Sequence, residues 1–173
     1  KEIRELSKFK KPIFYDGKFF DIKNTLIESV KSLKTLNVSY ATVHLLNGIE
    51  ALKATNHAAQ KINLKLLGVS VLTSFNDDDL EGLGFKNNLE DQVKKLTEIA
   101  LSANLHGIVC SPLEIKMIKK IAPKLKCFTP GIRMKDAKDD QKRTMNANEA
   151  IKEGSDCLII GRPITKGNPK ENI

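Results

Sequence analysis

The chain alternates short apolar runs with longer segments of helical period. The runs are rich in β-branched residues and contain few polar ones, which is typical of parallel strands covered on both faces. They lie at residues 12–15, 40–44, 65–72, 106–110, 126–129 and 156–161. Helices are predicted at residues 1–9, 22–36, 47–61, 88–103, 111–121 and 147–153. This order predicts a parallel sheet with right-handed crossovers in a single α/β domain over residues 1–173.

Hydrophilic residues, and a proline and a glycine of chemical interest, follow the carboxyl ends of successive predicted strands. They are Asp16, Lys18, His44, Thr73, Ser74, Pro112, Arg133, Gly161 and Arg162. An open doubly wound sheet also fits the alternation, but a closed (β/α)₈ TIM barrel collects such residues around one mouth. We therefore predict the barrel. A closed barrel needs two more strands, a helix precedes the first predicted strand, and no helix is predicted after the last. We therefore expect an N-terminal part and a C-terminal helix to be absent from this chain.

The composition is that of a globular protein. The chain has 173 residues, of which 40% are hydrophobic and 29% are charged, and this length suits one domain. It has no run of about 18 apolar residues that could span a bilayer, and its first residues are too highly charged for a signal peptide. We therefore expect a cytoplasmic protein that does not bind membranes. Cys110, Cys127 and Cys157 form no CxxC pair and are expected to be reduced core residues.

The formal net charge of +8 suits a phosphorylated partner. Nucleic acid is one such partner, but the lysines are scattered among acids, and the chain has no Trp and two Tyr for base stacking. The pattern therefore favours a small anionic ligand over nucleic acid.

The segment "YDGKFFD" places Asp16, Lys18 and Asp21 directly after the first predicted strand. If the strand continues to residue 18, Asp16 and Lys18 share a face that points into the mouth. In one interpretation, these two residues form a surface ion pair and Asp21 caps the helix that begins near Ile22. In the other, carboxylates hold the ammonium in a partly dry site, where its pKa and position are fixed for proton transfer. The spacing leaves both open.

Two later segments indicate a phosphate site. "TPGIR" at residues 129–133 precedes a long polar stretch, and "GRPIT" at residues 161–165 follows the last predicted strand. Gly161 allows its backbone to approach an anion, and Arg162 offers two parallel donors to a phosphate. Phosphate sites recur after the last strands of barrels.

These segments together resemble the orotidine 5'-phosphate decarboxylase family. The motifs D-x-K-x-x-D-I, "VLTS", "VCSP", "TPGIR", "DDQ" and "GRPIT" occur in the order and spacing of that family, over residues 10 to 166. The resemblance implies a (β/α)₈ barrel that works as a homodimer with shared active sites and without metal or organic cofactor. It implies decarboxylation of orotidine 5'-monophosphate (OMP) to UMP and carbon dioxide in de novo pyrimidine biosynthesis. It also implies that the absent N-terminal part holds the first two strands of the barrel, which in this family carry a ribose-binding aspartate and a further lysine.

The resemblance also implies a role for individual residues. Lys18 would protonate the ring carbon that loses carbon dioxide, Asp16 would be the carboxylate beside it, and Asp21 would serve the partner subunit's site. The implied substrate-binding residues are Thr73 and Ser74 at the pyrimidine edge or the loop above it, Pro130 in the base pocket, Arg133 and Gln141 near phosphate, base or loop, and Gly161 and Arg162 at the phosphate. One departure is "MNAN" at residues 145–148, where the family has Thr-Pro.

Two alternatives remain. One is a magnesium-dependent sugar-phosphate enzyme of the same barrel group, such as a hexulose-phosphate synthase or a keto-gulonate-phosphate decarboxylase, although "TPGIR" and "DDQ" fit the nucleotide enzyme better. The other is a catalytically inactive protein that binds a nucleotide phosphate. His44, His57 and His106 lack the spacing of metal ligands, and His44 is expected to make a structural hydrogen bond. Phe14, Phe19, Phe20 and Phe128 are expected in the core.

Overall fold

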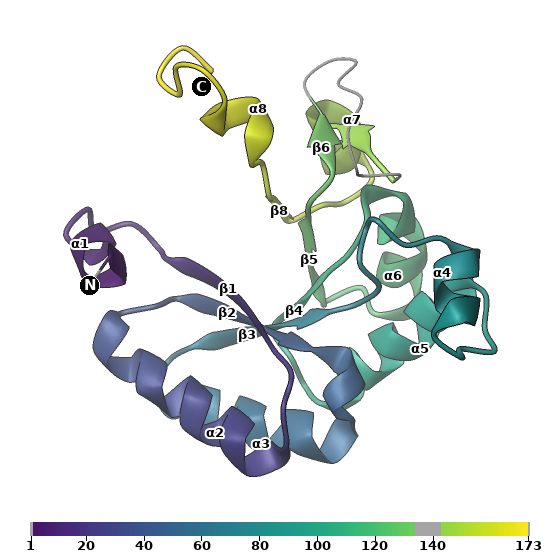
Figure 1. Ribbon diagram of the computed structural model, residues 1–173, viewed down its shortest axis with the longest axis horizontal. Helices are drawn as coiled ribbons and strands as arrows, with labels where there is room; N and C mark the ends of the chain where they lie inside the picture. The colour runs from purple at the N-terminus through teal and green to yellow at the C-terminus, as the bar shows by residue number, and fades with distance from the viewer. Residues whose placement is uncertain (1, 134–142, 173) are drawn as a thin grey trace. The chain divides into compact units, whose positions relative to one another are not determined.

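A computed structural model describes residues 2–133 and 143–172 (Figure 1). The chain forms two compact units. The first contains residues 1–70 and 96–108, and the second contains residues 71–95 and 109–173. Each unit is built from parallel strands and helices that alternate along the chain.

Three parallel strands form the sheet of the first unit. They are β1 (Phe14–Phe19), β2 (Tyr40–His44) and β3 (Lys65–Val69), and they lie side by side in chain order. The β2–β3 register is regular, with Tyr40 opposite Lys65 and His44 opposite Val69. A fourth strand, β4 (Gly107–Val109), starts next to β3, where the backbone N–H of His106 donates to the carbonyl of Leu66.

Two helices pack alongside one another next to these strands, as Figure 1 shows. They are α2 (Lys23–Ser32), which continues as the 3₁₀ helix η1 (Leu33–Leu36), and α3 (Ile49–Gln60), which follows the 3₁₀ helix η2 (Leu45–Asn47). Their apolar faces and the strands supply fully buried residues, namely Leu26, Val30, Ala41, Val43, Leu52, Leu66 and Leu67. This core fixes the carboxyl ends of β1 and β2 relative to each other. Helix α1 (Glu2–Ser7) precedes β1.

The second unit begins after β3. Its elements are α4 (Asp77–Gly82), the 3₁₀ helix η3 (Pro112–Glu114), α6 (Ile115–Ile121), β5 (Lys126–Thr129), β6 (Ile132–Arg133), β7 (Met145–Asn146), α7 (Ala147–Lys152), β8 (Cys157–Leu158) and α8 (Arg162–Thr165). Strand β5 pairs in parallel with β8, and β6 pairs in parallel with β7. Helix α5 (Leu89–Ser102) runs from this unit into the first.

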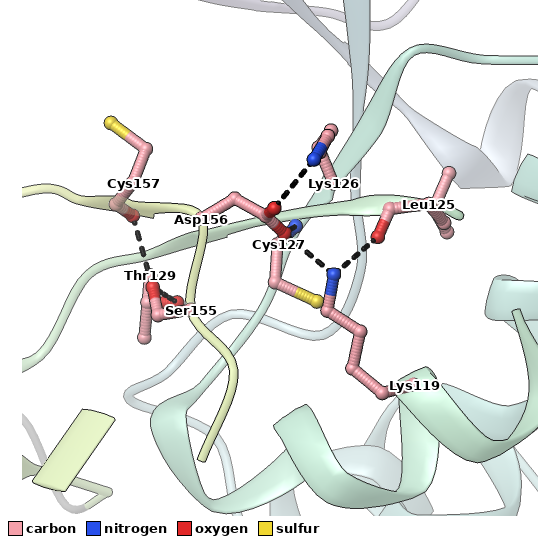
Figure 2. Close-up of polar contacts among 8 residues, drawn as sticks. All are labelled: Lys119, Leu125, Lys126, Cys127, Thr129, Ser155, Asp156 and Cys157. Atoms are coloured by element: carbon pink, nitrogen blue, oxygen red, sulfur yellow. Dashed lines mark hydrogen bonds and ion pairs between the residues drawn. The ribbon is translucent and has the colours of Figure 1, made fainter. Parts of the chain in front are cut away.

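Asp156 joins three elements at the start of β5 and β8 (Figure 2). Its carboxylate accepts hydrogen bonds from Lys119 of α6 at 2.6 Å, from Lys126 at 2.8 Å and from the backbone N–H of Cys127 at 2.9 Å. These contacts outweigh the effect of burial and lower the pKa of Asp156 to about 2. Lys119 also donates to the carbonyl of Leu125. Asp156 therefore holds α6, β5 and β8 together.

The strands predicted at residues 40–44 and 126–129 are confirmed at both ends. Helix α4 was not predicted, because its "DDDLEG" sequence has no apolar period; it forms through a capping box between Asn76 and Asp79 and acids in its first turn. The short helix α8 follows the last strand, where no helix was expected. The assignment of one domain stays a prediction.

The expected core is confirmed in part. Cys110, Cys127 and Phe128 are buried, but Cys157 is exposed because it lies on β8, a two-residue strand at the end of the strand order. Phe20 is also exposed, since it lies beyond β1 in the turn that leads to α2. No helix in the described part of the chain is long and apolar enough to cross a bilayer.

Candidate active site

A local irregularity in β1 shapes the segment that carries Asp16 and Lys18. Tyr15 pairs with Ala41 and Phe19 pairs with Val43, so an advance of four residues along β1 corresponds to an advance of two residues along β2. The extra residues bulge out of the ladder, and Lys18 takes a left-handed conformation with φ of 44°. Such a conformation is unusual for a residue with a side chain and is concentrated at functional sites.

Gly17 makes this bulge sterically possible. A Cβ atom at this position would lie 2.5 Å from Cε1 of Tyr15 and 3.1 Å from its Cδ1. The ring of Tyr15 is itself packed against Phe19, with ring centroids 5.8 Å apart. A larger residue at Gly17 would therefore displace an aromatic ring at the base of the bulge.

Lys18 and Asp16 are brought together as the sequence predicts. Nζ of Lys18 lies 2.5 Å from Oδ2 of Asp16, and each side chain is 45% exposed. An ion pair with this exposure contributes little stability by itself. Its geometry is fixed by a third residue, Thr42 of β2, which is fully buried.

The Thr42 hydroxyl connects to both members of the pair. It donates to Oδ1 of Asp16 at 2.8 Å and accepts from the backbone N–H of Lys18 at 2.8 Å. Each oxygen of the Asp16 carboxylate therefore has its own partner, and Lys18 is held at both its backbone and its ammonium group. The result is a cation and a carboxylate in a preorganised arrangement at the carboxyl end of β1, which suits proton transfer and stabilisation of developing charge.

Asp21 lies in the same turn but points to a different set of contacts. Its Oδ1 accepts from the backbone N–H of Ile22, and its own backbone N–H donates to Oδ1 of Asn47 at 3.0 Å. The N-cap of α2 is Ile22, which has no side-chain cap, so the interpretation of Asp21 as the capping residue is wrong. In the described part of the chain, no hydrogen bond or ion pair joins Asp21 to Lys18.

Asn47 ties the turn after β1 to the turn after β2. Its side-chain amide donates to the carbonyl of Phe19 at 2.9 Å and to that of His44 at 2.8 Å, while its oxygen accepts from Asp21. One side chain thus satisfies three backbone groups. Neither Asn47 nor Thr42 was predicted from the sequence. Thr42 could have been noticed as a polar residue in the middle of an otherwise apolar strand.

His44 lies beside this network at the end of β2. Burial and the positive charge of Lys18 lower the pKa of His44, so its imidazole is neutral at pH 7. Its ring contacts Phe20, with centroids 5.7 Å apart. The structural hydrogen bond expected for this side chain is absent at Nδ1, which is buried without a partner among the described residues.

The remaining predicted residues belong to the second unit. Thr73 and Ser74 are half-buried in a turn that closes through a 3.0 Å hydrogen bond from the backbone N–H of Phe75 to the carbonyl of Leu72. Pro130 and Arg133 are half-buried on either side of Gly131, whose φ of 78° needs a glycine.

Gly161 is exposed and is the N-cap of α8, and Arg162 is the first residue of that helix. A Cβ at Gly161 would meet nothing within 4 Å, so its backbone is open to a ligand. Gln141 lies outside the described residues. In the part of the chain that the structure describes, no group of three or more His, Cys, Asp or Glu residues could hold a metal ion.

Parallel strands that follow one another in chain order, separated by helices, are typical of (β/α)₈ barrel proteins, and the likeness to a solved structure given below confirms this fold class. The model of the orotidine 5'-phosphate decarboxylase / HUMPS family matches residues 1–173. The chain belongs to this family.

Individual relatives agree with this assignment. The chain is 42% identical over 167 residues to the orotidine 5'-phosphate decarboxylase of Wolbachia pipientis subsp. Culex pipiens (strain wPip), and the match covers 96% of this chain and 74% of the relative. It is 40% identical over 177 residues to the orotidine 5'-phosphate decarboxylase of Legionella pneumophila (strain Lens), covering 99% and 77%. The crystal structure of orotidine 5'-phosphate decarboxylase from Lactobacillus acidophilus superposes with a TM-score of 0.85 at 31% identity, covering 98% and 75%.

Proposed function

We propose that this protein decarboxylates OMP to UMP and carbon dioxide, with Lys18 as the proton donor. The observation that carries the proposal is the Lys18–Asp16 pair, held by Thr42 at the carboxyl end of β1, in a chain of this family. Relatives that match most of the chain are named as this decarboxylase. De novo pyrimidine biosynthesis is the corresponding pathway.

In this reaction, negative charge on the pyrimidine ring carbon must be stabilised before that carbon is protonated. The bond between the pyrimidine ring carbon and the carboxylate breaks, and its electron pair stays on the ring carbon as carbon dioxide leaves. Lys18 then gives a proton to that carbon and regains one from water. General acid catalysis supplies about 10²- to 10⁴-fold, whereas the slowest reactions need accelerations above about 10¹⁵-fold. Most of the acceleration must therefore come from fixed charges complementary to the carbanion, of which the Lys18 ammonium is the nearest.

Asp16 fixes the position of the proposed proton donor. Its carboxylate fixes the ammonium group through Oδ2, and Thr42 in turn fixes the carboxylate through Oδ1. The neutral state of His44 adds no second positive charge beside Lys18.

The substrate-binding roles are proposed for residues of the second unit. Thr73, Ser74 and Pro130 would contact the pyrimidine, and Gly161 and Arg162 would bind the phosphate. Arg133 and Gln141 would support the phosphate or the loop above it. The half-burial of Thr73, Ser74 and Pro130 and the open backbone at Gly161 support these roles.

We also propose that two copies form a homodimer in which Asp21 serves the partner's site. Support comes from exposed apolar side chains next to Asp21: Phe20 is 64% exposed, Ile22 is 73% exposed and Leu46 is 44% exposed. Asn47 joins the turns that carry them. A second copy would remove this apolar surface from water and approach Asp21 from outside its own chain.

The decisive assay is decarboxylation of OMP by the full-length protein, with and without EDTA, together with UMP binding. We expect turnover that survives chelation. Activity that disappears with EDTA would favour the magnesium-dependent sugar-phosphate enzyme. Tight UMP binding without turnover would indicate the catalytically inactive nucleotide-binding protein.

A further inference from the structure

Arg143 is a buried arginine for which the sequence predicts no role. Its side chain is 11% exposed and ion-pairs with Glu114, whose side chain is 6% exposed. Removal of one member of a buried ion pair is strongly unfavourable, because it leaves the other charge buried without its partner. The contacts of this guanidinium therefore show what it holds in place.

The first contact is with the turn that carries Thr73 and Ser74. Nη2 of Arg143 donates to the carbonyl of Leu72 at 2.8 Å and to that of Val71 at 3.3 Å. The Leu72 carbonyl also accepts the 3.0 Å hydrogen bond from Phe75 that closes this turn. Arg143 thus fixes the carbonyl on which the conformation of the turn depends.

The second contact is with the segment after β4. Nη1 of Arg143 donates to Oε1 of Glu114, and Oε2 of Glu114 accepts from the backbone N–H of Ser111 at 2.9 Å. Ser111 and Glu114 form the capping box of η3. Burial raises the pKa of Glu114, and the charge of Arg143 opposes that effect, so the arginine favours the ionised carboxylate.

The third connection is through the backbone. Two residues after Arg143, the N–H of Met145 donates to the carbonyl of Gly131, and β7 pairs with β6. Arg143 is therefore anchored beside the Pro130–Arg133 segment while its side chain reaches the Leu72 carbonyl. It joins three segments, two of which carry residues proposed to bind substrate.

We infer that Arg143 is a positioning residue that sets the pyrimidine-contacting turn of Thr73 and Ser74 relative to the Pro130–Arg133 segment. The inference rests on the proposed function. The planar fork of arginine can serve the carboxylate and two carbonyls at once, whereas lysine offers a single ammonium on a flexible stem. Arg143→Lys therefore keeps the positive charge but loses the planar set of donors that contacts the carboxylate and the two carbonyls.

The test is a double-mutant cycle on kcat/KM for OMP, corrected for the folded fraction by circular dichroism. Arg143→Lys should lower kcat/KM by about 10- to 100-fold in the wild-type background. In the Thr73→Ala/Ser74→Ala background the same change should cost less than about threefold, because the groups that Arg143 positions are gone. Lys120→Ala, at an exposed lysine of α6, is the control and should leave kcat/KM unchanged.

Equal losses in the two backgrounds, or a wild-type kcat/KM for folded Arg143→Lys, would overturn the inference and leave Arg143 a purely structural residue. If Arg143→Lys does not fold, the same cycle is run with Glu114→Gln, which keeps an acceptor for the guanidinium and removes its charge partner. A smaller loss with the same dependence on Thr73 and Ser74 is then expected, and additive effects would overturn the inference. An inactive wild-type protein would overturn the proposed function and this inference together.

Discussion

The buried hydroxyl of Thr42 lies 2.8 Å from the backbone nitrogen of Lys18 and accepts its hydrogen bond. The same hydroxyl donates to Asp16, so it orients both the proposed proton donor and the carboxylate beside it from the neighbouring strand. Lys18 occupies a left-handed conformation, which costs free energy for a residue with a Cβ. The hydrogen bond to Thr42 offsets part of that cost, which makes Thr42 a determinant of Lys18 geometry.

Thr42→Val should lower kcat for OMP by about 10- to 100-fold and the free energy of unfolding by about 1 to 2 kcal/mol, because it leaves a backbone N–H and a carboxylate oxygen without this partner. Thr42→Ser keeps the hydroxyl and is the matched control. Steady-state kinetics and urea denaturation measure both effects. A Val variant as active as the Ser variant would show that Lys18 does not need this support.

Asp156→Asn should lower the free energy of unfolding at neutral pH and remove the part of its pH dependence that comes from titration of this carboxylate. The folded pKa of Asp156 is about 2, below its ordinary value of 3.8, so its stabilisation is present above about pH 4 and is lost as the pH falls toward 2. The side chain is 23% exposed, and with solvent screening the loss at pH 7 should be about 1 kcal/mol.

Urea denaturation at pH 7, 4 and 3 checks this prediction. The difference in unfolding free energy between wild type and Asp156→Asn should shrink as the pH falls. Glu98→Gln on α5, an exposed carboxylate, is the control and should change little at any pH. A difference that is constant with pH would show that the lysines around Asp156 do not stabilise its ionised form.

Strands β1 to β5 and β8 could be predicted because each contains or overlaps an apolar run between segments of helical period, whereas the two-residue strands β6 and β7 could not. The bulge in β1 could not be predicted, because the alternation of residues predicts a regular strand. The bulge depends on space beside Tyr15 that only a glycine at position 17 leaves. Helix α4 escaped prediction because local capping, not apolar periodicity, forms it. The prediction of Phe20 as a core residue is wrong, because this side chain is exposed after the end of β1.

The candidate site could be predicted only where the motif itself carries the chemistry. The "DGKFFD" segment gave Asp16, Lys18 and Asp21, and the contact between Asp16 and Lys18 is confirmed. Thr42, Asn47 and Arg143 act through contacts between residues 24 to 72 positions apart. Such pairs come together only through strand order and register, which spacing along the chain does not reveal.

The shared-site proposal predicts complementation between two inactive variants. Homodimers of Lys18→Ala and of Asp21→Ala should each be nearly inactive. A mixed dimer contains one site with an intact Lys18 from one chain and an intact Asp21 from the other, so mixing should restore up to about one quarter of wild-type activity if pairing is random. Subunit exchange is verified with two differently tagged chains. Verified exchange without recovered activity would place Asp21 in its own chain's site.

The most direct test of the account is the rate of OMP decarboxylation by wild type and Lys18→Ala, measured together with the Kd for UMP. Wild type should turn over OMP, and Lys18→Ala should lose at least about 10³-fold in kcat while its Kd for UMP changes by less than about tenfold, because the ammonium acts on charge that exists only as carbon dioxide leaves. A folded Lys18→Ala variant that retains more than about one tenth of the wild-type rate would contradict the central role of Lys18.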